Sequence, residues 1–196
     1  MSDADDKLSR DVEIISAMAE NMRSYLLSET LFYPLSGSNM PRLTLGGYLL
    51  RQHRLSALRD LLTPEDQATL QAAMSAFSQA TDNMTVLLEK KAHREIDARL
   101  RQWTETVAEY LRDVSEERSG AHVTYRVAGE TRAMISALFA KLLQYPFELD
   151  GNLELRVRNI DRRLQTRWRD GTFIWDDSWI PAYPKEEYWY LYGEAY

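Results

Sequence analysis

Residues 63–118 have the sequence TPEDQATLQAAMSAFSQATDNMTVLLEKKAHREIDARLRQWTETVAEYLRDVSEER. Apolar residues recur in this segment every three or four positions, the period that gathers side chains on one side of an α-helix. Thr63 and Pro64 form a strong start signal, because threonine caps helices and proline suits the first helical turn. The segment therefore predicts long amphipathic helices. The apolar stripe consists of Leu70, Met74, Phe77, Met84, Leu88, Ile96, Leu100, Trp103, Val107, Tyr110 and Val114.

A single helix over residues 64–118 would be far longer than the three or four turns that are usual in globular proteins. Thr81, Asp82 and Asn83 lie inside this segment, and each has a side chain that suits a helix cap. We therefore expect two helices with a break or kink at these three residues. One continuous helix is the alternative.

The same period predicts further helices on both sides of this segment. Thr44 can cap the second helix, and Pro34 and Pro146 end the helices before them, because proline disfavours helical geometry in the preceding residue. The helix before Pro146 is apolar almost all round, which is typical of the centre of a bundle. The predicted additional helices occupy residues 8–33, 44–62, 130–145 and 152–169.

Residues 121–128 have an ambiguous pattern. Val123, Tyr125 and Val127 alternate with polar residues, which is typical of a short extended segment, although a lone strand has no obvious partner. Because every other segment is helical, we predict an all-α fold, an irregular bundle of five or six helices that occupies residues 1–170.

The chain ends in an aromatic segment, residues 171–196, which we expect to form an extended strap on the bundle. It holds nine of the 21 aromatic residues, and exposing most of them would create an apolar patch larger than a typical protein surface carries. Burial against the chain's own helices is the interpretation we favour. A partner or dimer clasp and a ring-lined ligand pocket are the alternatives. The candidate partner contacts are Trp175, Trp179, Tyr188, Trp189 and Tyr192.

Composition narrows the location and the partners. The 196 residues include no cysteine, which excludes disulfides and thiolate chemistry and fits a reducing compartment. Met1–Asp6 is acidic, unlike a signal peptide, and no apolar run is long enough to span a bilayer, so we expect a cytoplasmic protein without a membrane segment. The net charge of −6 argues against nucleic-acid binding.

Arginines crowd residues 152–169, but on a helix they flank the apolar stripe on both sides and form no single basic stripe. Acidic residues dominate the segment 171–196 that follows. We therefore expect ion pairs between acids of this segment and helix arginines rather than a nucleic-acid surface.

One polar group of the second predicted helix stands out. Gln52 and Arg59 project toward its apolar side, and His53 lies at the margin. A buried arginine needs a carboxylate, or the carboxylate or phosphate of a ligand, so these residues are a candidate site for an anionic ligand. The structural alternative is an internal Arg59 salt bridge, with Gly46 and Gly47 allowing close helix packing.

Glu89 and His93 share one helical face and extend this candidate ligand site. Metal-binding bundles need several more acids and histidines from other helices, so we predict no metal site and no cofactor. No sequence motif identifies a catalytic residue. The function we predict is therefore a non-enzymatic protein–protein interaction or assembly protein, with itself (a homo-oligomer) or another protein as partner. The alternative is a ligand-binding or enzymatic bundle with the polar site at Gln52, His53 and Arg59.

Overall fold

The computed structural model describes residues 3–37 and 39–196, and they form an irregular helical bundle, which confirms the predicted all-α class. Its α-helices are α1 (Asp3–Leu27), α2 (Leu45–Ala57), α3 (Pro64–Thr81), α4 (Thr85–Ser115), α5 (Ala121–Leu142) and α6 (Gly151–Gln165). Its 3-10 helices are η1 (Arg59–Leu61), η2 (Asp177–Ala182) and η3 (Trp189–Leu191), and its strands are β1 (Trp168–Phe173) and β2 (Tyr192–Ala195).

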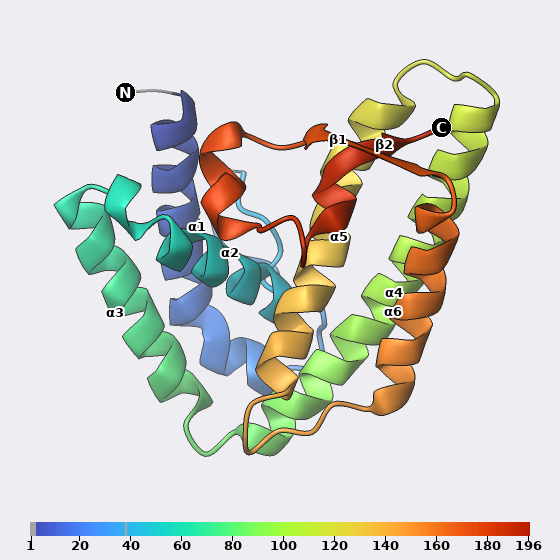
Figure 1. Ribbon diagram of the computed structural model, residues 1–196. Helices are drawn as coiled ribbons and strands as arrows, with labels where there is room; N and C mark the ends of the chain where they lie inside the picture. The colour runs from blue at the N-terminus through green and yellow to red at the C-terminus, as the bar shows by residue number, and fades with distance from the viewer. Residues whose placement is uncertain (1–2, 38) are drawn as a thin grey trace.

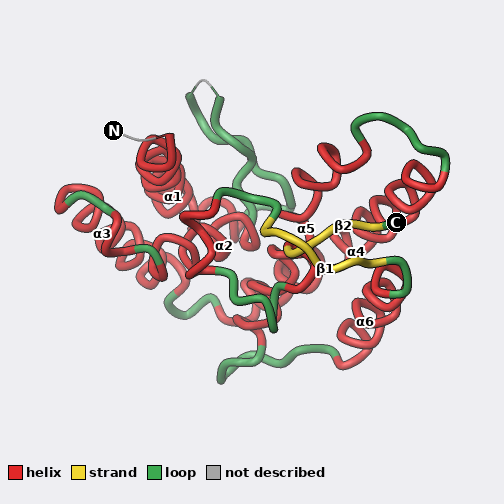
Figure 2. Tube along the Cα trace, turned by 45° about the horizontal axis from the view of Figure 1, so that its top comes forward, coloured by secondary structure: helices red, strands yellow, loops and turns green. Residues whose placement is uncertain are grey.

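The helices form two outer groups with a central pair between them. Helix α1 packs on α3, and α4 packs on α6, while α2 and α5 contact each other in the middle (Figures 1 and 2). The C-terminal residues then cross the central pair and contact α2, α5 and α4. None of the helices formed by residues 3–37 and 39–196 combines the length and the apolar character that crossing a bilayer requires.

The predicted break inside residues 64–118 is confirmed. Thr63 caps α3 as expected, with its Oγ1 accepting from the amide of Asp66 at 3.1 Å. The chain leaves the helix at Asp82 and passes through Asn83, whose φ of 57° is left-handed, before α4 begins. Asparagine tolerates this conformation better than most residues, so the cap-type residues do divide the stripe into two helices.

The predicted ends of the first two helices were wrong. The first helix ends at Leu27 rather than near Tyr33, because Tyr33 forms an antiparallel bridge with Leu43, with N–O distances of 3.0 and 2.8 Å. The second helix ends at Ala57 rather than at Leu62. After Ala57 the chain tightens into a 3-10 turn, in which the amide of Leu61 donates to the carbonyl of Leu58 at 2.9 Å. A helical period alone reveals neither this turn nor the pairing of Tyr33 with a distant backbone partner.

The ambiguous residues 121–128 belong to helix α5, so the extended alternative was wrong. Tyr125 is buried, where its ring stacks on Tyr110 at 4.3 Å, while the flanking Val123 and Val127 are exposed. The alternation thus reflects one buried and one solvent-facing side of a helix. Helix α5 begins after Gly120, whose left-handed φ of 87° suits glycine.

The last helix also ends early, at Gln165 instead of Arg169. Trp168 starts strand β1, which pairs antiparallel with β2. The indole Nε1 of Trp168 donates to the carbonyl of Tyr192 at 3.2 Å. Of the expected ion pairs between tail acids and arginines, Arg169–Glu194 forms, but Arg156 pairs with Asp97 of α4 at 2.5 Å.

The aromatic C-terminal segment folds against the helices (Figure 1). The side chains of Tyr183 and Tyr190 are 0% exposed, and the hydroxyl of Tyr125 in α5 donates to the carbonyl of Tyr190 at 2.9 Å. Tyr110 of α4 accepts from the amide of Ala195 at 3.0 Å. The aromatic rings are thus part of the core of this protein.

Candidate functional site

Helix α2 is fixed in the middle of the bundle by buried ion pairs that the sequence did not single out. Arg54 is 2% exposed, and its Nε and Nη2 donate to Asp11 of α1 at 2.8 and 2.5 Å. Arg51 donates to the other oxygen of Asp11 at 3.1 Å. Arg54 also lies 4.0 Å from the ring centre of Trp179 and donates to the hydroxyl of Tyr183 at 3.4 Å, so one arginine joins α1, α2 and the C-terminal segment.

The first turn of α2 is held by α4. The buried carboxylate of Glu95 accepts from the amide of Gly46 at 3.1 Å and from Nε of Arg99 at 2.7 Å. A Cβ on Gly46 would lie 2.7 Å from Glu95 Oε1 and 3.1 Å from the Cβ of Met134. The part of the structural alternative in which Gly46 allows close helix packing is therefore confirmed.

Arg59 does not occupy the buried position that we predicted. Because α2 ends at Ala57, the helical register on which the prediction depended is lost. Arg59 lies in η1 and is exposed, while its neighbours Leu58 and Leu62 are buried. The buried arginine of this helix is Arg54 instead, and its partner is a carboxylate of the protein.

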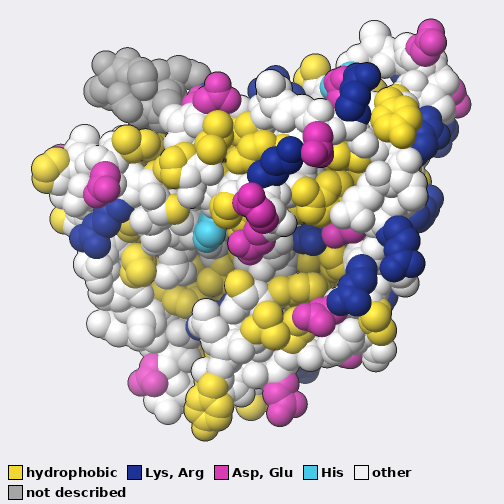
Figure 3. All heavy atoms as spheres, viewed as in Figure 1, with side chains coloured by type: hydrophobic (Ala, Val, Ile, Leu, Met, Phe, Trp, Pro, Cys, Tyr) yellow, Lys and Arg dark blue, Asp and Glu magenta, His cyan; other side chains and the backbone are white. Residues whose placement is uncertain are grey.

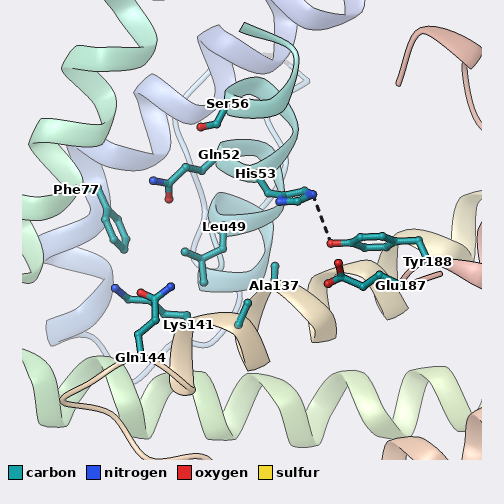
Figure 4. Close-up of a pocket in the computed structure, with 11 residues that line it drawn as sticks. Leu49, Gln52, His53, Ser56, Phe77, Ala137, Lys141, Gln144, Glu187 and Tyr188 are labelled. Carbon is teal, nitrogen blue, oxygen red and sulfur yellow. Dashed lines mark hydrogen bonds between the residues drawn. The ribbon is translucent and has the colours of Figure 1, made fainter. Parts of the chain in front are cut away.

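Gln52 and His53 do lie together, in the wall of a cleft. The cleft has a volume of about 340 Å³ and lies between α2, α3, α5 and the C-terminal segment (Figure 4). Its apolar side chains are Leu49, Phe77, Ala137 and Ala140, and its polar ones are Gln52, His53, Ser56, Lys141, Gln144, Glu187 and Tyr188. Figure 3 shows a hollow near the middle of this face, with apolar side chains inside it.

The histidine of the cleft has one ring nitrogen already engaged. His53 Nε2 lies 2.6 Å from the carbonyl oxygen of Ala182, which can only accept, so Nε2 carries the hydrogen. The hydroxyl of Tyr188 lies 3.4 Å from the same nitrogen and can only share that hydrogen as an acceptor (Figure 4). Burial raises the pKa of Tyr188, so this hydroxyl keeps its proton and can donate it to a ligand.

Lys141 is the lysine of this cleft, and its ammonium has no acidic partner in the part of the chain that the structure describes. It comes from α5, near the carboxyl end of the helix, and desolvation by burial lowers its pKa. No carboxylate of residues 3–37 and 39–196 forms a salt bridge with it. The Nζ atom of Lys141 lies over the ring of Phe147, 5.0 Å from the ring centre. The cleft thus combines an apolar wall with a cation that has no carboxylate partner among the described residues.

Glu89 and His93 lie outside the cleft, at the connection between α5 and α6. Glu89 accepts from the amide of Glu148 at 3.0 Å. His93 Nδ1 donates to the carbonyl of Glu89 at 2.9 Å, and its Nε2 accepts from the amide of Asp150 at 3.3 Å. Both side chains therefore satisfy backbone groups of this connection, and the structure does not bring them together with Gln52 and His53.

The five candidate partner contacts lie within the intramolecular aromatic cluster. Trp175 donates to the carbonyl of Arg126 at 2.8 Å, and its ring lies 6.2 Å from Trp179. Tyr188 is buried beside Tyr190. The ring of Trp189 contacts Trp168, and the ring of Tyr192 contacts Phe173.

The fold and the lining residues define a helical bundle with an amphipathic cleft. Comparison with known proteins finds no matching protein family, no matching curated sequence and no matching solved structure. The function of this chain must therefore be argued from the chemistry of its own residues.

Proposed function

We propose that this protein binds a small organic anion that has an apolar body, in the cleft between α2, α5 and the C-terminal segment. The observation that carries the proposal is the ammonium of Lys141, which is partly desolvated and lacks an acidic partner among the described residues. Removing a cation from water is unfavourable unless an opposite charge compensates it. A carboxylate or phosphate group of a ligand would supply that charge.

The other groups of the cleft support the same ligand class. Leu49, Phe77 and Ala137 offer an apolar surface for the body of the ligand, while the amide of Gln52 and the hydroxyl of Tyr188 offer hydrogen-bond donors. The single acid of the lining, Glu187, is exposed. Mostly apolar walls with a few convergent polar groups are typical of small-molecule sites.

Binding rather than catalysis is the proposed activity. Ser56 and His53 both line the cleft, but no hydrogen bond joins them within the described chain, and the Nε2 hydrogen of His53 is committed to Ala182. The pair therefore lacks the geometry of an activated nucleophile. A cytoplasmic location is part of the proposal and is supported by the absence of cysteine.

The proposal is tested by isothermal titration calorimetry with decanoate and decyl phosphate on the wild type and on Lys141→Met. We expect saturable binding that the substitution weakens roughly ten- to a hundredfold, since a hydrogen bond to a charged group contributes about 1.5–3 kcal/mol. Lys90→Met is the matched control, because Lys90 is exposed on α4, and it should bind like the wild type. Equal binding by both variants, or no binding by the wild type, would refute the proposal.

A further inference from the structure

The cleft contains a second charged side chain, and its sign is opposite to that of Lys141. Glu187 lines the cleft from the turn that precedes η3. Within residues 3–37 and 39–196, the carboxylate of Glu187 forms neither an ion pair nor a hydrogen bond. Lys185 lies two residues earlier, but it pairs with Asp170 at 3.0 Å. The carboxylate of Glu187 is therefore available to a molecule in the cleft.

The two charges lie on opposite sides of the cleft. Figure 4 shows Lys141 on α5 at one side and Glu187 at the other, with Ala137 between them. No salt bridge joins Lys141 to Glu187 in the described chain. Desolvation lowers the pKa of Lys141, and no carboxylate of the described residues is close enough to oppose that shift. The cleft thus holds two separate opposite charges rather than one ion pair.

Both charged side chains stand on fixed backbone. Lys141 belongs to the last turn of α5. The amide of Glu187 donates to the carbonyl of Pro184 at 3.1 Å, and the next side chain, Tyr188, is buried. The fold therefore sets the spacing of the two backbone positions, and charges held in this way favour ligands whose own charges have a matching separation.

The wall between the two charges is apolar. Leu49 of α2 and Ala137 and Ala140 of α5 contribute to it. Ala137 precedes Lys141 by about one helical turn, which corresponds to about 6 Å along the helix axis. A molecule that contacts both charges has to cross this surface, and the contact is favourable when the middle part of the molecule is apolar as well.

We infer that the ligand is a zwitterion with a carboxylate and an ammonium group at opposite ends of an apolar body, that is, an ω-amino carboxylate. The inference rests on the proposed function and adds a cationic end to the anionic ligand proposed there. The carboxylate pairs with Lys141 and the ammonium pairs with Glu187, so each charge that leaves water finds an opposite charge. A fatty acid or an alkyl amine satisfies one end of the cleft alone.

The test is isothermal titration calorimetry with 4-aminobutanoate, 6-aminohexanoate and 8-aminooctanoate, each compared with the plain carboxylate of the same length. Glu187→Gln removes the negative charge and keeps the size of the side chain. It should weaken the ω-amino carboxylates that span the cleft about two- to fivefold, as for an exposed ion pair, and should not weaken the plain carboxylates. Glu186→Gln is the matched control, because Glu186 is exposed next to Glu187 and does not line the cleft, and it should bind every compound like the wild type.

The outcomes separate this inference from the proposed function. Plain carboxylates whose binding depends on Lys141, together with ω-amino carboxylates of which none responds to Glu187→Gln, would overturn the zwitterion and leave the anion site in place. An equal loss in Glu186→Gln would also overturn it, because the effect would then come from the overall charge. Absence of binding by every compound, decanoate included, would refute both proposals.

Discussion

Replacing Gly46 with alanine tests the packing that positions α2 and, with it, the wall of the cleft. The new Cβ would lie 2.7 Å from the carboxylate of Glu95, 3.1 Å from Met134 and 3.2 Å from Leu138. Overpacking of this kind destabilises by about 1–3 kcal/mol. Displacing the carboxylate also weakens its hydrogen bond with the Gly46 amide, and bonds of this charged type contribute about 1.5–3 kcal/mol.

We therefore expect Gly46→Ala to lower the free energy of unfolding by about 2–5 kcal/mol, after allowing for the roughly 0.5–1 kcal/mol by which alanine favours a helix. Urea denaturation followed by circular dichroism measures this change, and the melting temperature should fall by about 10 °C. Gly151→Ala is the matched control, since no atom lies within 4 Å of its added Cβ, and it should be neutral or slightly stabilising. Equal stabilities for the two variants would refute the packing argument.

Two other predictions concern the ion pair and the buried tyrosines. Arg54→Met leaves the buried Asp11 with only Arg51, so it should lower the free energy of unfolding, measured in urea, by about 3 kcal/mol. The double variant Arg54→Met/Asp11→Leu should lose less stability than Arg54→Met, because it leaves no buried carboxylate without its partner. A double variant that is less stable than the single one would contradict this. Burial raises the pKa of Tyr183 to about 12, so the folded state holds a proton that the unfolded state loses near pH 10. This contribution to the free energy of unfolding is therefore fully present below pH 10 and is lost as the pH rises toward 12. The tyrosinate absorbance should therefore increase together with loss of helical signal, and a gradual increase in a protein that stays folded would count against it.

Much of the helical framework follows from local patterns. The caps at Thr44 and Thr63 and the break at Asp82 depend on residues close to each helix end, and all three were predicted. The missed ends depend on distant partners: Tyr33 leaves the helix to pair with Leu43, and the last helix stops because β2 supplies a strand partner from the end of the chain. A helical period contains no information on such partners.

The candidate site was predicted in part for the same reason. Gln52 and His53 were found because polar residues on an apolar helix side need an explanation, but Arg59 was chosen by extending α2 beyond Ala57. Lys141 was missed because the helix that contains it looks like a buried core helix. The sequence did mark this position, since Lys141 is the sole charged residue between Met134 and Phe147.

The most direct test of the ligand proposal is the pKa of the Lys141 ammonium, measured by nuclear magnetic resonance with and without decanoate. Desolvation should hold this pKa below the ordinary lysine value in the free protein. A bound carboxylate favours the charged form, so saturation with decanoate should raise the pKa. A Lys141 pKa that is the same in the presence and absence of saturating anion would contradict the account.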